Sequence, residues 1–129
     1  MILASSAVVS IVRREHGHAD LVEAIEAAPE VAIGTGTLPE TSALLVGHFG
    51  VLGRAILARF LEENRVVEIP FSADHWRLAS EASIRFGEGR HPADLDPVEC
   101  MTYATAQLAG EPLLFVGDGF ARTDVVAAV

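Results

Sequence analysis

The chain has 129 residues, half of them hydrophobic, and its nine arginines and eighteen acidic residues give a formal net charge of −9. This length and composition fit one folded domain and exclude a disordered chain, and the acidity argues against a simple nucleic-acid-binding module, which neutralises phosphates with basic side chains. No apolar run reaches the roughly 20 residues of a membrane span, no signal peptide is recognisable and Cys100 is the single cysteine, so we expect a cytoplasmic protein with no membrane contact and no internal disulfide.

Short apolar segments and helical patterns alternate along the chain. Strands are predicted at residues 2–3, 31–33, 66–69 and 113–116, and helices from about residue 6 and at 18–27, 37–48, 52–61, 72–86 and 97–108. In the helix at 72–86 we expect an inner face made of Trp76, Ala79, Ser83 and Phe86. The repeated strand–helix order predicts one α/β domain over residues 1–129, with a central parallel sheet of four or five strands and helices on both faces.

Three acidic residues, Glu40, Glu99 and Asp118, lie just past predicted strand ends or at predicted helix starts. The carboxyl ends of parallel strands share one edge of the sheet, so these distant residues are expected to converge there. Ala4 follows the first strand and belongs to the same edge. Clustered carboxylates hold Mg²⁺ or Mn²⁺, which can orient a phosphodiester and activate water.

The same residues also have a purely structural interpretation. Thr37 and Glu40, like Asp96 and Glu99, have the spacing of a capping box, in which a helix cap is followed three positions later by a glutamate. Asp118 sits between two glycines after a strand, as turn residues do. Spacing alone favours capping and turn roles. Capping and metal binding can coexist, because a carboxylate has two oxygens.

The C-terminal half carries the most distinctive sequence pattern. Its motifs are, in order, FGEGRHPADL at 86–95, DPVEC at 96–100, TYATA at 102–106, EPLLFVGDGF at 111–120 and TD at 123–124. They closely resemble the VapC-type toxins of the PIN-domain ribonuclease family, in which G-K-G-R-H-P-A-x-L-N-F-G-D-C precedes Y-A-x-A and G-D-D-F-x-x-T-D. The opening MILASSAVV fits the family's M-I-x-D-[TS]-S-A, so the resemblance spans essentially the whole chain.

The resemblance implies a PIN-like three-layer sandwich with an acidic Mg²⁺ (or Mn²⁺) site that cleaves RNA. It also implies a homodimer and a cognate antitoxin as partners. Matched residue by residue, Glu40 is the acid after the second strand, Glu99 stands where the family has Asp, and Asp118 is the first Asp of G-D-D-F. These three are the implied catalytic residues. With Asp124, which matches the T-D acid, they are the implied metal ligands.

Three further residues are assigned to RNA binding. Arg90 and His91 lie in the glycine-rich loop before the last helix and are candidate phosphate contacts, and Ser6 belongs to the opening motif. The alternative for Arg90 and His91 is that they have no binding role, because such loop residues are commonly just exposed to solvent.

The chain departs from the family pattern at the site itself. Ala4 stands where the family has its first metal-binding Asp, Glu99 has a longer side chain than Asp, and Gly119 replaces the second Asp of G-D-D-F. The sequence therefore predicts a toxin ribonuclease that is attenuated or inactive in this form. The alternative is a non-catalytic PIN-fold module that still binds an antitoxin or a dimer partner.

Overall fold

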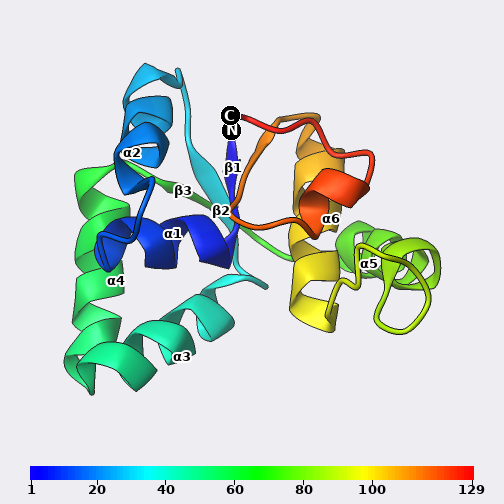
Figure 1. The fold of residues 1–129 in the computed structure, drawn as a ribbon, viewed down its shortest axis with the longest axis horizontal. Coiled ribbons are helices and arrows are strands. Elements are labelled where there is room, and N and C mark those ends of the chain that lie inside the picture. Colours follow the sequence, from blue (N-terminus) through cyan, green and yellow to red (C-terminus); the bar gives the residue numbers. More distant parts are fainter.

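Four short strands form one parallel sheet in the computed structural model, which describes residues 1–129 (Figure 1). They are β1 (Ile2–Leu3), β2 (Ala32–Gly34), β3 (Val67–Ile69) and β4 (Leu113–Leu114), in the spatial order β3-β2-β1-β4. Ile2 pairs with Ala32 on one side and with Leu113 on the other. The predicted parallel sheet is thus confirmed, with β4 two residues shorter than expected.

Six helices connect and cover the strands. They are α1 (Ser5–Val12), α2 (His18–Ala27), α3 (Leu38–Phe49), α4 (Leu52–Glu63), α5 (Ala73–Phe86) and α6 (Pro97–Ala109), and a short 3₁₀ helix, η1 (Phe120–Arg122), follows β4. Figure 1 shows α1 to α4 on one side of the sheet and α5 with α6 on the other. No helix is both long enough and apolar enough to cross a lipid bilayer.

The hydrophobic core has two parts, one on each face of the sheet. Ile2 and Leu113 belong to the cluster under α5 and α6, whereas their neighbours Leu3 and Leu114 belong to the cluster under the other helices. Successive strand residues point to opposite faces, so a strand covered on both sides is apolar throughout. This confirms the three-layer architecture.

Helix α5 is rotated relative to the prediction. Its buried residues are His75, Ala79, Ala82 and Phe86. Trp76, by contrast, is 56% exposed, with the Arg77 guanidinium 5.3 Å from the centre of its ring. The predicted inner positions Trp76 and Ser83 are therefore wrong. The histidine turns inward because its Nδ1 accepts the Ser72 backbone N–H at 3.1 Å and completes a cap, which outweighs the greater hydrophobicity of the indole.

The hairpin of α3 and α4 depends on one close backbone approach. A Cβ atom at Gly53 would lie 2.4 Å from the Val46 nitrogen and 2.6 Å from the Leu45 oxygen. A Cβ at Gly47, also within a helix of this hairpin, would meet nothing within 4 Å. The two glycines therefore form a matched pair for testing the packing.

We expect Gly53→Ala to lower the free energy of unfolding by about 1–3 kcal/mol, because the backbones must separate to admit the methyl group. Gly47→Ala is expected to raise it by about 0.5–1 kcal/mol, because alanine is the better helix former. Urea denaturation of both variants measures the two effects. A similar change in both would contradict the close approach.

Candidate active site

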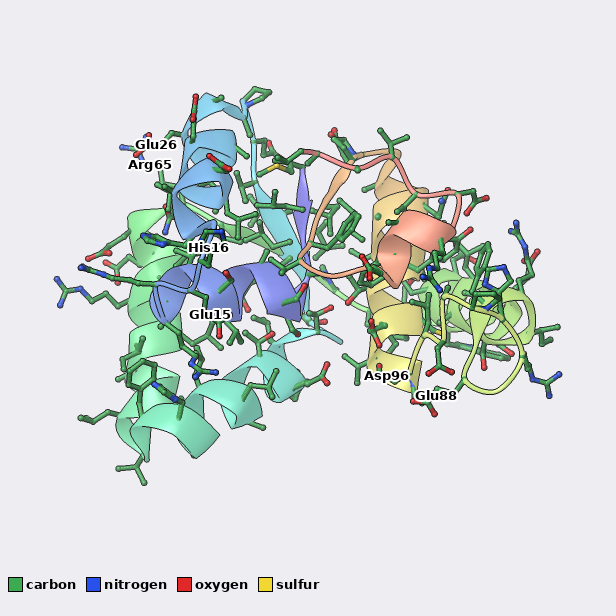
Figure 2. The ribbon with its side chains drawn as sticks, in the orientation of Figure 1. Glu15, His16, Glu26, Arg65, Glu88 and Asp96 are labelled. Atoms are coloured by element: carbon green, nitrogen blue, oxygen red, sulfur yellow. The ribbon has the colours of Figure 1, made fainter.

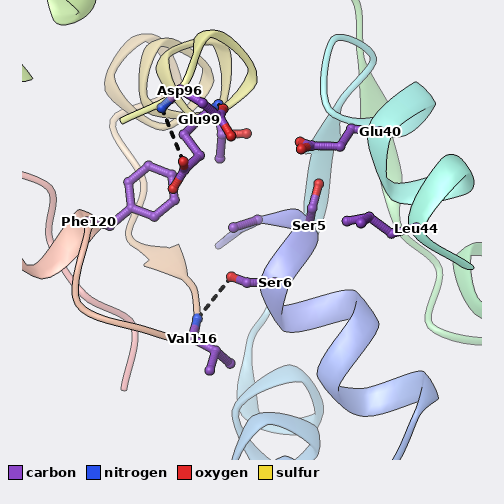
Figure 3. A pocket seen from close by; sticks show the side chains of 10 residues that line it. Ser5, Ser6, Glu40, Leu44, Asp96, Glu99, Val116 and Phe120 are labelled. Carbon is purple, nitrogen blue, oxygen red and sulfur yellow. Dashed lines mark hydrogen bonds between the residues drawn. The ribbon is translucent and has the colours of Figure 1, made fainter. Parts of the chain in front are cut away.

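A cavity of about 170 Å³ opens at the edge of the sheet where β1 and β4 end (Figure 3). Its walls come from the N-terminal ends of α1, α3 and α6 and from the segment between β4 and η1. The lining residues are Ala4, Ser5, Ser6, Glu40, Leu44, Asp96, Glu99, Thr102, Val116 and Phe120. The structure therefore brings Glu40 and Glu99 together beside Ala4.

At the start of α6, Asp96 and Glu99 form a capping box. Asp96 Oδ1 accepts the Glu99 N–H at 2.8 Å, and Glu99 Oε1 accepts the Asp96 N–H at 3.2 Å. Each carboxylate thus keeps a second oxygen without a protein partner. Glu99 Oε2 lies 3.6 Å from the place where a side chain at Gly119 would begin. Capping and exposure to the pocket therefore coexist at this helix.

At the start of α3, the capping box expected from the sequence is absent. Thr37 has a helical backbone conformation, and its hydroxyl lies 2.8 Å from the Thr102 hydroxyl, not on the backbone of α3. Glu40 is consequently free of a capping role. Figure 3 shows its carboxylate directed into the pocket, on the same side as the Ser5 hydroxyl. The capping prediction fails here because a buried tertiary partner claims the cap residue.

The carboxylates share a poorly solvated space. The pKa of Glu99 is raised to about 7, mainly by burial and also by the negative charges of Asp96 and Glu40, against the opposing effect of the backbone hydrogen bond at Asp96. Burial also raises the pKa of Glu40, with a second contribution from Asp96. Like charges held this close favour protonation or a bound cation.

The donors fit a hard cation with few protein ligands. Carboxylate and hydroxyl oxygens from Glu40, Asp96, Glu99 and Ser5 line the pocket, and Mg²⁺ commonly takes only one or two protein carboxylates and keeps several waters. No three His, Cys, Asp or Glu side chains are grouped closely enough to bind one ion together. Ala4, which lines the pocket and is 2% exposed, contributes a methyl group and no charge.

Two predicted metal ligands lie outside the pocket lining. Asp118 is exposed in the segment between β4 and η1. The Asp124 carboxylate accepts the Tyr103 hydroxyl at 2.6 Å and the Arg85 guanidinium at 3.4 Å. The hydrogen bond from Tyr103 lowers the pKa of Asp124. Asp124 thereby ties the C-terminal segment to α5 and α6.

The predicted RNA-binding residues have different settings. Ser6 lines the pocket and accepts the Val116 N–H at 3.0 Å. Arg90 is exposed outside the lining. His91 accepts the Ala93 N–H at 3.0 Å through Nδ1, and its ring packs edge-on against Phe86. Of the three, Ser6 alone is part of the cavity wall.

Sequence reasoning missed several residues of the pocket lining, among them the polar Asp96 and Ser5. The sequence pattern indicates only a capping role for Asp96, whereas its place at the carboxyl edge of the sheet also brings it into the pocket lining. Figure 2 shows Asp96 at the end of α6 beside Glu88, which stands where the related pattern has Lys. The same view places His16 far from Asp96, on the turn between α1 and α2.

Comparisons with known proteins agree with this architecture. The PIN domain family model matches residues 1–126. VapC ribonuclease Mb2004c from Mycobacterium bovis and ribonuclease VapC36 from Mycobacterium tuberculosis are each 40% identical over 126 residues, which cover 97% of this chain and 91% of theirs. Ribonuclease VapC from Mycolicibacterium smegmatis is 35% identical, with 98% of both chains covered.

Solved structures share the fold at low sequence identity. VapC20 of Mycobacterium tuberculosis, described as a sarcin-ricin loop cleaving toxin, matches with a TM-score of 0.80 and 18% identity, covering 97% of this chain and 95% of its own. A toxin–antitoxin complex from Klebsiella pneumoniae matches with a TM-score of 0.72 and 18% identity, covering 99% and 97%. The chain therefore belongs to the PIN-domain family and, within it, to the VapC toxin ribonucleases.

Proposed function

We propose that this protein is the toxin of a toxin–antitoxin pair, an Mg²⁺- or Mn²⁺-dependent endoribonuclease that is attenuated or inactive because of Ala4. The supporting observation is the pocket at the carboxyl edge of the sheet, where Glu40, Asp96 and Glu99 surround a buried alanine. The metal, when bound, would lower the pKa of its water and neutralise charge on the scissile phosphate. The proposal treats residues 1–129 as one PIN domain.

In this proposal the protein's own residues orient the RNA and hold the cation loosely. Glu40 and Glu99 supply the principal ligand charge, and Asp96 adds negative charge at the start of α6. Ser6 fixes the segment around Val116 through its hydrogen bond. Arg90 and His91 lie outside the lining, so their proposed phosphate contacts require RNA that extends beyond the cavity. Asp118, proposed as a catalytic residue and metal ligand, also lies outside the lining. Weak Mg²⁺ binding is expected, because position 4 brings no charge.

The second candidate is a non-catalytic module that binds a protein partner. Two positions that carry carboxylates in the related pattern, Ala4 and Gly119, carry none here. At the α3–α4 turn, Phe49, Val51 and Leu52 are 36%, 88% and 66% exposed, and exposed apolar patches mark interaction sites. The solved relatives include VapBC2 from Rickettsia felis bound to promoter DNA. We therefore propose an antitoxin, a second copy of the chain, or both as partners.

Ala4→Asp is expected to raise Mn²⁺- or Mg²⁺-dependent cleavage of RNA by on the order of 10²-fold. The new carboxylate would hold the cation in a fixed position, and small misplacements of a catalytic group cost factors of that size. Cleavage of single-stranded and structured RNA with each metal, against the Ala4 form, measures the gain.

Glu40→Gln in the restored protein is the matched control. It removes one ligand charge with little change in shape and should abolish the gain. If the restored protein folds, binds metal and still cuts no RNA, the non-catalytic candidate replaces the enzyme. Equal cleavage by the parent and by Ala4→Asp would move the active site elsewhere.

The Glu99 carboxyl gives a pH-dependent stability. Its pKa lies at about 7 in the folded protein, above the ordinary value of 4.5, so the folded state holds the extra proton between these values. The free energy of unfolding should therefore fall as the pH rises from about 4.5 to about 7 and stay level above. Glu99→Gln keeps an oxygen for the Asp96 N–H and should remove the larger part of the decline, leaving the part that comes from the raised pKa of Glu40.

At pH 8 we expect the Glu99→Gln variant to be more stable than the parent by on the order of 1 kcal/mol, a value reduced because the side chain is only half-buried. Near pH 4 the two proteins should be equal. Denaturation across this pH range tests the prediction, with the exposed Glu62→Gln as control. An unchanged pH profile in Glu99→Gln would exclude Glu99 as the source.

The apolar turn between α3 and α4 is expected to mediate self-association. Val51→Asp should lower the sedimentation coefficient of the isolated chain toward that of a monomer, because it places a charge in the contact. Ile84→Asp changes an equally apolar side chain, 66% exposed on α5, and should leave sedimentation unchanged. A parent protein that sediments as a monomer at all concentrations would leave the antitoxin as the sole proposed protein partner.

A further inference from the structure

A short chain of hydroxyl groups connects the pocket to the interior of α3. The Ser5 and Thr41 hydroxyl oxygens lie 2.8 Å apart, and the Thr41 hydroxyl donates to the Thr37 carbonyl at 2.8 Å. Ser5 lines the pocket, whereas Thr41 is fully buried. The chain therefore runs from the site into a region without solvent.

Counting protons gives the favoured direction of these hydrogen bonds. A threonine hydroxyl has one proton, and Thr41 gives its proton to the Thr37 carbonyl. The bond between the two hydroxyls must then be donated by Ser5 and accepted by Thr41. Ser5 has no second proton, so its oxygen can offer only lone pairs to the pocket.

The surroundings favour this arrangement. Thr41 is 0% exposed, and Thr37, whose carbonyl ends the chain, is 1% exposed. The Thr37 carbonyl also accepts the Thr41 N–H at 3.2 Å, so reversing the bond between the hydroxyls would remove one of its two donors, at a cost of about 0.5–1.5 kcal/mol. In the absence of a competing group in the pocket, the hydroxyl chain therefore keeps this direction.

We propose that Thr41 is a positioning residue, which takes the Ser5 proton and so presents Ser5 Oγ as an acceptor-only oxygen to a divalent cation or to its bound water beside Glu40. This inference rests on the proposed metal-dependent function. Figure 3 shows the Ser5 hydroxyl and the Glu40 carboxylate directed to the same side of the pocket. A neutral oxygen here adds a ligand without adding to the repulsion among the carboxylates.

Thr41→Val, which removes the hydroxyl at nearly constant shape, tests the proposal. Thr41→Ser retains the hydroxyl and should behave as the parent. Thr105→Val is the matched control, because Thr105 is also buried and also donates to the carbonyl four residues earlier, at 2.9 Å, but lies outside the pocket lining. Ser5→Ala removes the proposed ligand itself.

Two measurements follow the effect. The first is the Hα–Hβ coupling of Ser5 by NMR without metal, which should report one rotamer in the parent and averaging in Thr41→Val. The second is Mn²⁺ affinity by electron paramagnetic resonance. Thr41→Val and Ser5→Ala should each weaken binding by about three- to tenfold, the equivalent of one hydrogen bond, and the double variant should be no weaker than Ser5→Ala alone.

Several results would overturn the inference. One is a single Ser5 rotamer in Thr41→Val, and another is parental Mn²⁺ affinity in that variant while the parent binds normally. A loss of affinity in Thr105→Val equal to that in Thr41→Val would show a general effect of removing buried hydroxyls. Absence of Mn²⁺ binding in every protein, Ala4→Asp included, would overturn the proposed function and the ligand role of Ser5 together.

Discussion

The parallel pairing of β1 with both of its neighbours is the constraint on which the site depends. Ile2 pairs with Ala32 and with Leu113, and the Ala4 N–H continues the ladder by donating to the Leu114 carbonyl at 3.0 Å. Because the strands are parallel, the helices that follow β1 and β2 start at the same edge, and α6, which precedes β4, starts there as well. The N-terminal ends of α1, α3 and α6 therefore meet around Ala4, and side chains from four distant parts of the sequence share one cavity.

This convergence has an electrostatic cost. The helix starts carry partial positive charge, which favours the carboxylates of Glu40 and Glu99, but burial and mutual repulsion raise the pKa of both. A fourth carboxylate at position 4 would add to that repulsion whenever no cation is bound. Alanine brings no such charge, so under the proposed function Ala4→Asp would exchange stability of the metal-free fold for ligand charge, a trade-off common at functional sites.

The sequence predicted the architecture and part of the site because both depend on local signals. Apolar segments and caps placed all six helix starts within one residue of those observed, and the two pocket glutamates follow from the shared sheet edge. The errors arose where contacts between distant parts of the chain, and not the local sequence, determine which side chains are buried or line the pocket. His75 takes the buried place expected for Trp76. Asp118 lies outside the lining, beyond the early end of β4 at Leu114. Just before it, the Val116 N–H donates to Ser6 Oγ. This hydrogen bond joins residues 110 positions apart and has no local sequence signal.

The hydroxyl contacts around the pocket explain how the site can lose a charge and keep its shape. Ser6 holds Val116, Ser5 bonds to Thr41, and Thr37 bonds to Thr102, each at 3.0 Å or less. None of these contacts involves the side chain at position 4. The position of the cavity walls is thus set by these hydrogen bonds, independently of the carboxylates. An alanine in place of one acid would alter the electrostatic field in the cavity and leave these hydrogen bonds intact. One aspartate introduced at position 4 could recover catalysis only if the cavity walls keep their positions, and these hydrogen bonds meet that condition.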